Sequence, residues 1–269
     1  MEKEYNSKLT IFFLLFLTLV SPFGFFIYAF LKVVRESILA ASIKSFEFIS
    51  LSELLFSFYV SATSTLISIT LGSVMSFYLG NYSRAKLNYG ILNIVLVLPH
   101  IAFAYIIYLF FSETGFLFRF LNLFGLTTEF NLINDKWGLG IMLNYVLKEV
   151  PFIILYLLAT NTRQMGNHIY AAKDLGASAI QCFFKIYIPL NKIQITSVSI
   201  VIFAFVLGNY EVPFLLGANS PQFLSVSALN NFQSIDIDQN NASYLKVIII
   251  FSVAFLTSIV LRLFVRNKG

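Results

Sequence analysis

Ionisable side chains lie at two places inside long apolar stretches of the chain, where a charge needs a partner or a function. Lys148 and Glu149 are adjacent, so on a helix their side chains point about 100° apart and each can pair across helices instead. Two interpretations stay open for them: a structural role, as an ion pair or at a helix break, and direct contact with a solute. His100 follows Pro99 in another apolar stretch, which is expected to be interrupted at these two residues. It is either a neutral imidazole bonded to a neighbouring carbonyl or hydroxyl group, or part of a solute path.

A further group of polar residues lies in the segment GNYEVP at 208–213. Glycine and proline weaken a helix there, while Asn209, Tyr210 and Glu211 bring hydrogen-bonding groups to the break. An acidic group at the mouth of a solute path attracts a cation, more strongly where water is scarce. The alternative is a helix end at an interface, with Glu211 hydrated. The candidate solute path therefore comprises His100, Asn209, Tyr210 and Glu211.

The sequence carries no pattern typical of catalysis. It has no GxxxxGK[ST] loop, so we do not expect it to bind ATP in that way. His100 and His168 lie in separate segments, and Cys182, the single cysteine, has no activating partner in the sequence. One cysteine also excludes an internal disulfide framework and a cysteine-cluster metal site. We predict that the chain is not an enzyme and holds neither a metal nor a cofactor.

Composition indicates a membrane protein. Of 269 residues, 58% are hydrophobic and 12% are charged, whereas soluble domains carry about 25% charged residues. The apolar residues come in blocks of roughly twenty, the length of a helix that crosses the hydrocarbon layer. The fold class that follows is an all-α membrane protein, forming one transmembrane domain over residues 1–269. The net charge of +5 indicates topology rather than nucleic-acid binding, because the charges avoid the apolar blocks.

Six membrane spans are expected, at 10–31, 54–79, 87–111, 137–159, 193–216 and 244–264. The first is interpreted as retained, because no A-x-A cleavage site follows it. A mixed connection is expected at 31–53, and an irregular one, with short interfacial helices, at 112–135. The second span repeats small residues every four positions, which favours close helix packing and leaves a polar face on a solute path as the alternative: Ser64, Ser68, Gly72, Ser76 and Gly80.

Lysine and arginine predict the orientation, since they are enriched in cytoplasmic loops. With both termini inside, most of the 18 Lys and Arg residues lie in inner segments, and most acidic residues lie in outer ones. Both termini are therefore predicted to be cytoplasmic. The same orientation places the long polar connection at 161–192 in the cytoplasm.

That connection contains the stretch YAAKDLGASAIQCFFKIYIPL at 170–190. Ala171 and Ala172 favour a helix with a small-residue face. Gly176 stands where a helix ends or turns sharply, because glycine enters left-handed geometry without a steric penalty. A second apolar segment follows, and Pro189 is expected to stop it. The local prediction is a helix, a glycine elbow, a second helix and a proline stop.

This pattern resembles the EAA loop of membrane subunits in binding-protein-dependent ABC importers. Ala171, Ala172, Gly176, Ile186, Ile188 and Pro189 match the motif, and Tyr170 stands where the family has a leading glutamate. LPHIAFAY and FLLGANSPQFLSVSAL are similar to segments of the thiamine, polyamine and ferric-ion branch of that family. The resemblance implies that a coupling helix docks on an ATPase subunit. The residues it assigns to docking are Tyr170, Ala171, Ala172, Asp174, Gly176 and Pro189.

The resemblance further implies a bacterial inner-membrane permease that forms half of a solute path. Its expected partners are a cytoplasmic ABC ATPase dimer that carries ATP and Mg, a second permease subunit, an extracytoplasmic solute-binding protein and membrane lipid. Solute choice would rest largely with the binding protein. The competing hypotheses are an ATP-independent secondary transporter or channel, and a membrane scaffold that transports nothing.

Overall fold

The computed structural model describes residue 16 and residues 21–39, 43–81, 90–125, 132–160 and 163–266. All regular secondary structure in these ranges is helical. Two compact units are formed by the chain, one from residues 1–49 and 230–249, the other from 50–229 and 250–269. The second unit contains every candidate site residue.

The elements of the first half are α2 (Ser21–Leu39), α3 (Ile43–Glu47), α4 (Leu51–Asn81), α5 (Gly90–Val97), α6 (His100–Phe111), α7 (Phe116–Leu123) and α8 (Leu139–Thr160). Those of the second half are α9 (Arg163–Asp174), α10 (Ala179–Cys182), the π-helix η2 (Phe183–Tyr187), α11 (Ile188–Leu190), α12 (Lys192–Gly208), α13 (Glu211–Leu216), α14 (Leu224–Phe232) and α15 (Ile237–Arg266).

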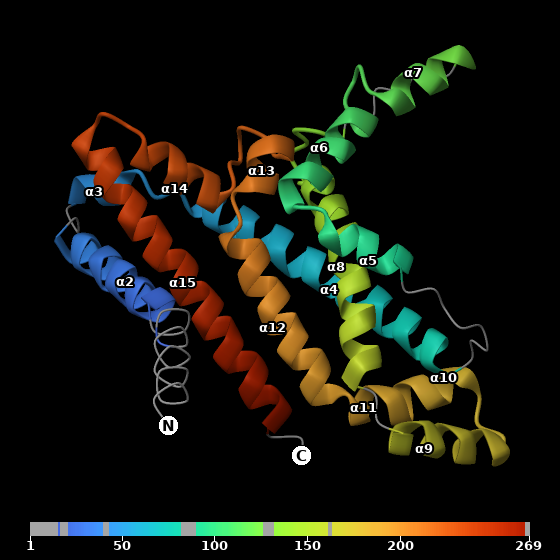
Figure 1. Ribbon diagram of the computed structural model, residues 1–269. Helices are drawn as coiled ribbons and strands as arrows, with labels where there is room; N and C mark the ends of the chain where they lie inside the picture. The colour runs from blue at the N-terminus through green and yellow to red at the C-terminus, as the bar shows by residue number, and fades with distance from the viewer. Residues whose placement is uncertain are drawn as a thin grey trace, which may run out of the picture. The chain divides into compact units, whose positions relative to one another are not determined.

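The larger unit is built on the packing of α4 along α8, with α12 against both (Figure 1). Small residues let the two helices approach closely. A Cβ on Gly72 would lie 2.5 Å from Cγ2 of Ile153, so only glycine fits there. Ser64, Ser68 and Ser76 are also buried on α4, which confirms the packing-face interpretation for these four members of the ladder. Gly80, the fifth member, is exposed.

Two helices of this unit are interrupted, and both interruptions were predicted. The first separates α5 from α6 at Pro99, which precedes the first residue of α6. The second separates α12 from α13 at Asn209 and Tyr210. Proline and glycine cannot keep a regular helix through these points, so polar backbone groups are released and must find other partners.

The smaller unit joins α2 to the first turns of α15. The hydroxyl of Ser37 on α2 donates to the carbonyl of Tyr244 at 3.0 Å. Phe232 and Tyr244 pack edge to face at 6.2 Å between ring centroids. Helical structure through Leu39 and again in α3 differs from the mixed connection expected at 31–53.

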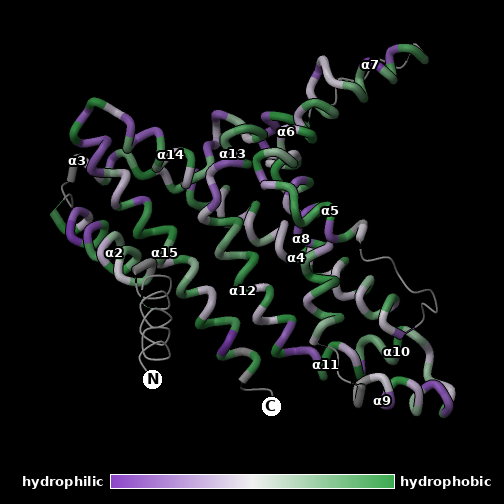
Figure 2. Tube along the Cα trace, in the orientation of Figure 1, coloured by the Kyte–Doolittle hydropathy of each residue, from purple (hydrophilic) through white to green (hydrophobic). Residues whose placement is uncertain are grey.

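Four helices in the described ranges are long and apolar enough to cross a membrane, or five if the bent pair 179–190 and 192–208 counts as one span. The four are Leu51–Asn81, His100–Leu123, Leu139–Thr160 and Ile237–Leu263. They correspond to the expected second, third, fourth and sixth spans, although the third begins only after Pro99 and the sixth helix begins at Ile237. Of the expected first span, residues 21–31 form the first part of α2, and residues 10–15 and 17–20 lie outside the described residues. Figure 2 shows apolar residues along much of α8 and α12, with hydrophilic residues more frequent on α9.

Candidate functional site

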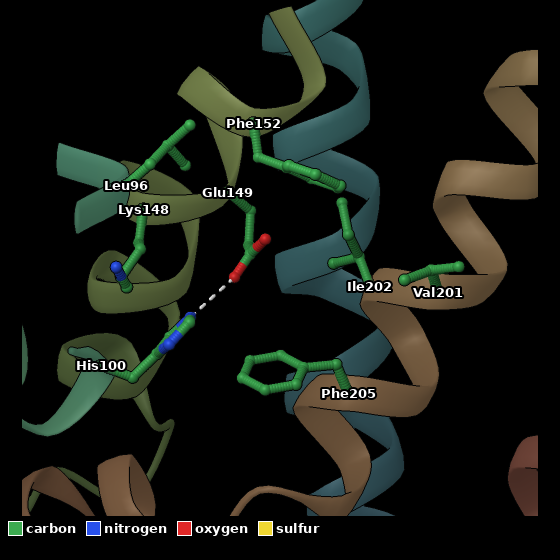
Figure 3. Close-up of a pocket in the computed structure, with 8 residues that line it drawn as sticks. All are labelled: Leu96, His100, Lys148, Glu149, Phe152, Val201, Ile202 and Phe205. Atoms are coloured by element: carbon green, nitrogen blue, oxygen red, sulfur yellow. Dashed lines mark hydrogen bonds and ion pairs between the residues drawn. The ribbon is translucent and has the colours of Figure 1, made fainter. Parts of the chain in front are cut away.

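His100 and Glu149 meet between two helices. His100 is the first residue of α6, and Glu149 lies on α8. The Nε2 atom of His100 lies 3.1 Å from Oε1 of Glu149, as the dashed line in Figure 3 marks. The side chains are 27% and 10% exposed respectively. The histidine thus bonds to a carboxyl group, and not to the carbonyl or hydroxyl group that one of its two interpretations named.

Lys148 points away from Glu149 and serves a different purpose (Figure 3). Its Nζ donates to the carbonyl oxygens of Val95, at 3.1 Å, and Leu98. In a continuous helix the carbonyl of Val95 would accept from residue 99, but Pro99 has no N–H. Lys148 therefore caps the end of α5, where a cation is also favoured by the helix dipole. Of the structural roles that the sequence left open, Lys148 has the one at the helix break, and Glu149 has an ionisable partner in His100.

A cavity of about 230 Å³ lies beside this group, between α5, α6, α8 and α12. His100, Lys148 and Glu149 lie along one side of it, and the remaining walls are apolar (Figure 3). The ring of His100 lies 4.7 Å, centroid to centroid, from that of Phe205. The other apolar walls are Leu96, Phe152, Val201 and Ile202.

The second helix break is closed by Asn209. Its Oδ1 accepts from the hydroxyl of Tyr145 and from the N–H of Val212, each at 3.2 Å. Its carbonyl accepts from the hydroxyl of Ser225 at 2.8 Å. These bonds satisfy the groups that the break would otherwise leave unpaired. Asn209 thus stabilises the break through hydrogen bonds within the chain.

Tyr210 and Glu211 follow Asn209 in the chain. Tyr210 is 45% exposed, and Glu211 is partly exposed in the first turn of α13. An acidic residue is favoured there by the helix dipole. The four residues expected to line one path therefore divide between the two breaks: His100 lies at the first, and the other three lie at the second.

The stretch at 170–190 forms the predicted helix and glycine elbow. The helix α9 ends at Asp174, and Gly176 follows with φ +84°. The N–H of Gly176 donates to the carbonyl of Lys173 at 2.8 Å, and that of Ala177 donates to Ala172 at 2.9 Å. This pair of bonds is the Schellman arrangement, which requires left-handed backbone at the position of the glycine.

A capping box begins the second helix. The Oγ of Ser178 accepts from the N–H of Gln181, whose side chain accepts from the N–H of Ser178. The helix continues through a π-helical segment and ends at Leu190, with a bend of 74° into α12. Pro189 was predicted to stop the helix. It lies inside the last turn instead, and the bend comes at Asn191.

One face of this helix–elbow–helix region is buried. Ile169 of α9 packs with Cys182 and Tyr187 of the second helix and with Phe77 of α4, all of them buried. Ala172 is partly buried against the same cluster. The alanine therefore provides the close approach between α9 and its partner helix, while Ala171 and Asp174 are exposed.

The opposite face exposes large apolar side chains. Leu175 is 89% exposed, Ile180 70% and Phe184 65%. Tyr170 is 55% exposed, and the Nζ of Lys173 lies 5.5 Å from the centroid of its ring. Exposed apolar side chains of this kind, beside a well-packed inner face, are typical of a surface that contacts another protein or a membrane.

Sequence reasoning did not find the contact between this region and α4. The hydroxyl of Tyr187 donates to the Oγ of Ser76 at 3.1 Å, across 111 residues of sequence. Ser76 had been noted only for its spacing in the small-residue ladder, and nothing in the sequence marks Tyr187 as its partner. Tyr145 was also missed, because a tyrosine in an apolar stretch gives no sign of the hydrogen bond that it makes.

Residues 68–268 match the family described as "Binding-protein-dependent transport system inner membrane component". The chain belongs to this family. The match begins on α4 and extends into the last residues of the chain, so it includes both helix breaks and the α9–α11 region. The resemblance inferred from 170–190 is thereby confirmed, and with it membership of a family of multi-pass inner-membrane transport components.

Among its relatives is the Escherichia coli K12 inner membrane ABC transporter permease protein YnjC, 27% identical over 54% of this chain and 27% of YnjC. The E. coli K12 spermidine/putrescine transport system permease protein PotB is 28% identical over 61% of this chain and 60% of PotB. Both alignments cover less than two thirds of the relative. Both relatives are named as permeases.

The fold is similar to that of a chain in a bacterial alginate ABC transporter bound to its alginate-loaded periplasmic protein. The TM-score is 0.75, and the match covers 99% of this chain and 97% of that chain. At 15% sequence identity, this likeness establishes a shared fold.

Proposed function

We propose that this chain is the membrane-spanning permease subunit of an ATP-driven importer, in which a separate ATPase docks on the α9–α11 region. The observation that carries the proposal is the two-sided character of that region. Its inner face is packed, while Leu175, Ile180 and Phe184 are exposed. Burying three such side chains on a partner is favourable by about 1.5–3 kcal/mol each before the cost of association.

The Gly176 elbow supports docking by fixing the angle between α9 and the second helix. Both helices are short, and the Schellman bonds and the capping box leave few free backbone groups at their junction. Tyr170, Ala171, Asp174 and Gly176 would lie at or beside the docked face, with Pro189 at its far end, and Ala172 would support that face from the packed inner side. A rigid pair of helices loses little conformational entropy on binding.

The remaining partners follow from the same family. We assign the chain half of a solute path, completed by a second permease subunit that is either a copy or a related chain, with solute delivered by an extracytoplasmic binding protein. Both termini and the α9–α11 region lie on the cytoplasmic side in this arrangement, which the positive charges of the inner segments support. ATP and Mg are held by the ATPase.

The cavity beside His100 is the part of the chain that best fits a solute path. It is concave and mainly apolar, with polar groups on one side. Tyr210 and Glu211 offer a second group at the α12–α13 break, whereas Asn209 is engaged in internal bonds. PotB is named for spermidine and putrescine, and the structural neighbour for alginate, an acidic polysaccharide. Because these solutes differ in charge, the relatives do not select a solute for this chain.

Co-purification tests the proposal. The tagged chain, expressed in its own host, is extracted in mild detergent, and its partners are identified by mass spectrometry and assayed for ATP hydrolysis. We expect a stoichiometric P-loop ATPase and a second permease subunit. A folded, monodisperse preparation without any ATPase would contradict the proposal and favour an ATP-independent transporter.

A further inference from the structure

A buried tyrosine joins the inner face of the α9–α11 region to α4. Tyr187 is fully buried, and its hydroxyl donates to the Oγ of Ser76. Its ring lies 5.2 Å from that of Phe77 and 5.8 Å from that of Phe183, centroid to centroid. Phe77 and Phe183 pack edge to face at 5.3 Å. The three rings and one hydroxyl bond therefore fasten the last part of α4 to the second helix of the region.

Tyr187 also stands at the point where the helix changes geometry. It is the last residue of the π-helix Phe183–Tyr187, a form that is rare in proteins and is frequent at functional sites. The carbonyl of Tyr187 accepts two hydrogen bonds from Asn191, one from the backbone N–H at 3.0 Å and one from the side-chain Nδ2 at 3.2 Å. Asn191 is the residue at the bend into α12. One residue thus contacts the docking region, the bend and α4.

Contacts continue from α4 into the centre of the unit. Four residues before Ser76, Gly72 lies so close to Ile153 of α8 that no side chain fits between them. On the same helix, Lys148 and Glu149 hold the break between α5 and α6. Close-packed contacts of this kind transmit a displacement, because the interior has little free volume to absorb it.

We propose that Tyr187 and Ser76 form the junction through which movement of the ATPase-docking region is delivered to α4. Tyr187 is a positioning residue in this scheme, which rests on the proposed function. Ring packing alone would hold the helices together, since Phe77 and Phe183 already fill the site. The hydroxyl pair adds a directional contact that favours one arrangement of the two elements. Its loss corresponds to a roughly fivefold change in a two-state equilibrium.

The experiment compares variants of the purified complex with its ATPase, reconstituted in nanodiscs. Tyr187→Phe and Ser76→Ala each remove one hydroxyl and leave the rings in place. Thr65→Val is the matched control, because Thr65 is buried on α4 and its hydroxyl bonds only to Ser61 of its own helix. Hydrogen–deuterium exchange of α4 and α8 is measured without nucleotide and after trapping with ATP and orthovanadate.

In the wild type and in Thr65→Val, we expect trapping to change the exchange of α4 and α8. In Tyr187→Phe and Ser76→Ala, we expect the bound ATPase to remain and the melting temperature to stay within about 2 °C, while at least about half of this change is lost. The double variant should lose no more than either single variant, because both remove the same contact. If one variant does not fold, the other gives the same test.

Three results would overturn the inference alone. The first two are a full response in both single variants, and bound ATPase with no response of α4 in the wild type. The third is a loss of the exchange response only in proportion to a fall in melting temperature, because it would show that the hydroxyl contact contributes to stability alone. An ATPase missing from the wild-type complex would instead refute the proposed function, and the inference with it.

Discussion

The α5–α6 break and the α9–α11 region differ in the side chains that they leave exposed. At the break, polar groups are satisfied within the chain: Lys148 binds two carbonyl oxygens, and Glu149 binds His100. In the α9–α11 region, polar backbone groups are satisfied equally well by the Schellman bonds and the capping box, while Leu175 is left 89% exposed.

The difference indicates whether each region needs a binding partner to satisfy or bury its side chains. A buried charge without a partner is costly in an apolar environment, so the break must be complete before any solute arrives. An exposed leucine on a rigid turn has no stabilising role in the isolated chain. We therefore expect substitutions at the break to lower stability, and substitutions on the exposed face to lower partner binding without lowering stability.

The largest effect is expected from Leu175→Asp. A charge placed on the exposed face would be buried against the ATPase, which should reduce ATPase recovery at least about tenfold. The melting temperature should be unchanged, because the side chain makes no buried contact. Quantitative mass spectrometry of the purified complex measures the recovery. Leu123→Asp is the matched control: Leu123 is 82% exposed at the end of α7.

Equal recovery in Leu175→Asp and wild type would remove the exposed face from the docking surface. Equal loss in both aspartate variants would show that recovery reports general damage, and the contrast between the two regions would then fail.

A smaller effect, on stability, is expected from Glu149→Leu. This change removes the partner of His100 and leaves a mainly buried imidazole unpaired, which should cost about 1–3 kcal/mol. Glu149→Gln is the matched control, since its amide can still bond to His100. Thermal unfolding in detergent compares the two. We expect Glu149→Leu to melt lower than Glu149→Gln, with normal ATPase recovery in both; identical melting would show that the contact contributes nothing.

Much of the α9–α11 region was predictable because its signals are local. Ala172, Gly176 and the segment that follows act through bonds between residues at most five positions apart, so spacing alone gives the helix and the elbow. The helix breaks at Pro99 and Asn209 follow from the same kind of signal. Pro189 misled the prediction, because proline is tolerated in a helical turn whose N–H is not needed.

The partners of these residues were not predictable, because they depend on how distant helices pack. Lys148 reaches carbonyl groups 50 and 53 residues away, and Tyr187 reaches Ser76 across 111. A rotation of one residue, about 100°, would turn either side chain to another neighbour. Adjacent Lys148 and Glu149 illustrate this: the same roles were open for both residues, and the fold provides them with different partners.

The smallest effect is expected from Gly176→Ala, which separates the elbow from the face it presents. A Cβ there meets nothing within 4 Å, so the cost is backbone strain at φ +84°, about 1 kcal/mol. Gly125→Ala is the matched control, because Gly125 has φ +70° and equally open surroundings. Both variants should lose similar local stability, measured by hydrogen–deuterium exchange near each glycine. Only Gly176→Ala should also lower ATPase recovery, by a few-fold, because docking needs the angle that the elbow fixes. If recovery stays at the wild-type level while α9 exchanges faster, the elbow shapes the free chain but not the docked one, and docking then depends on the apolar side chains alone.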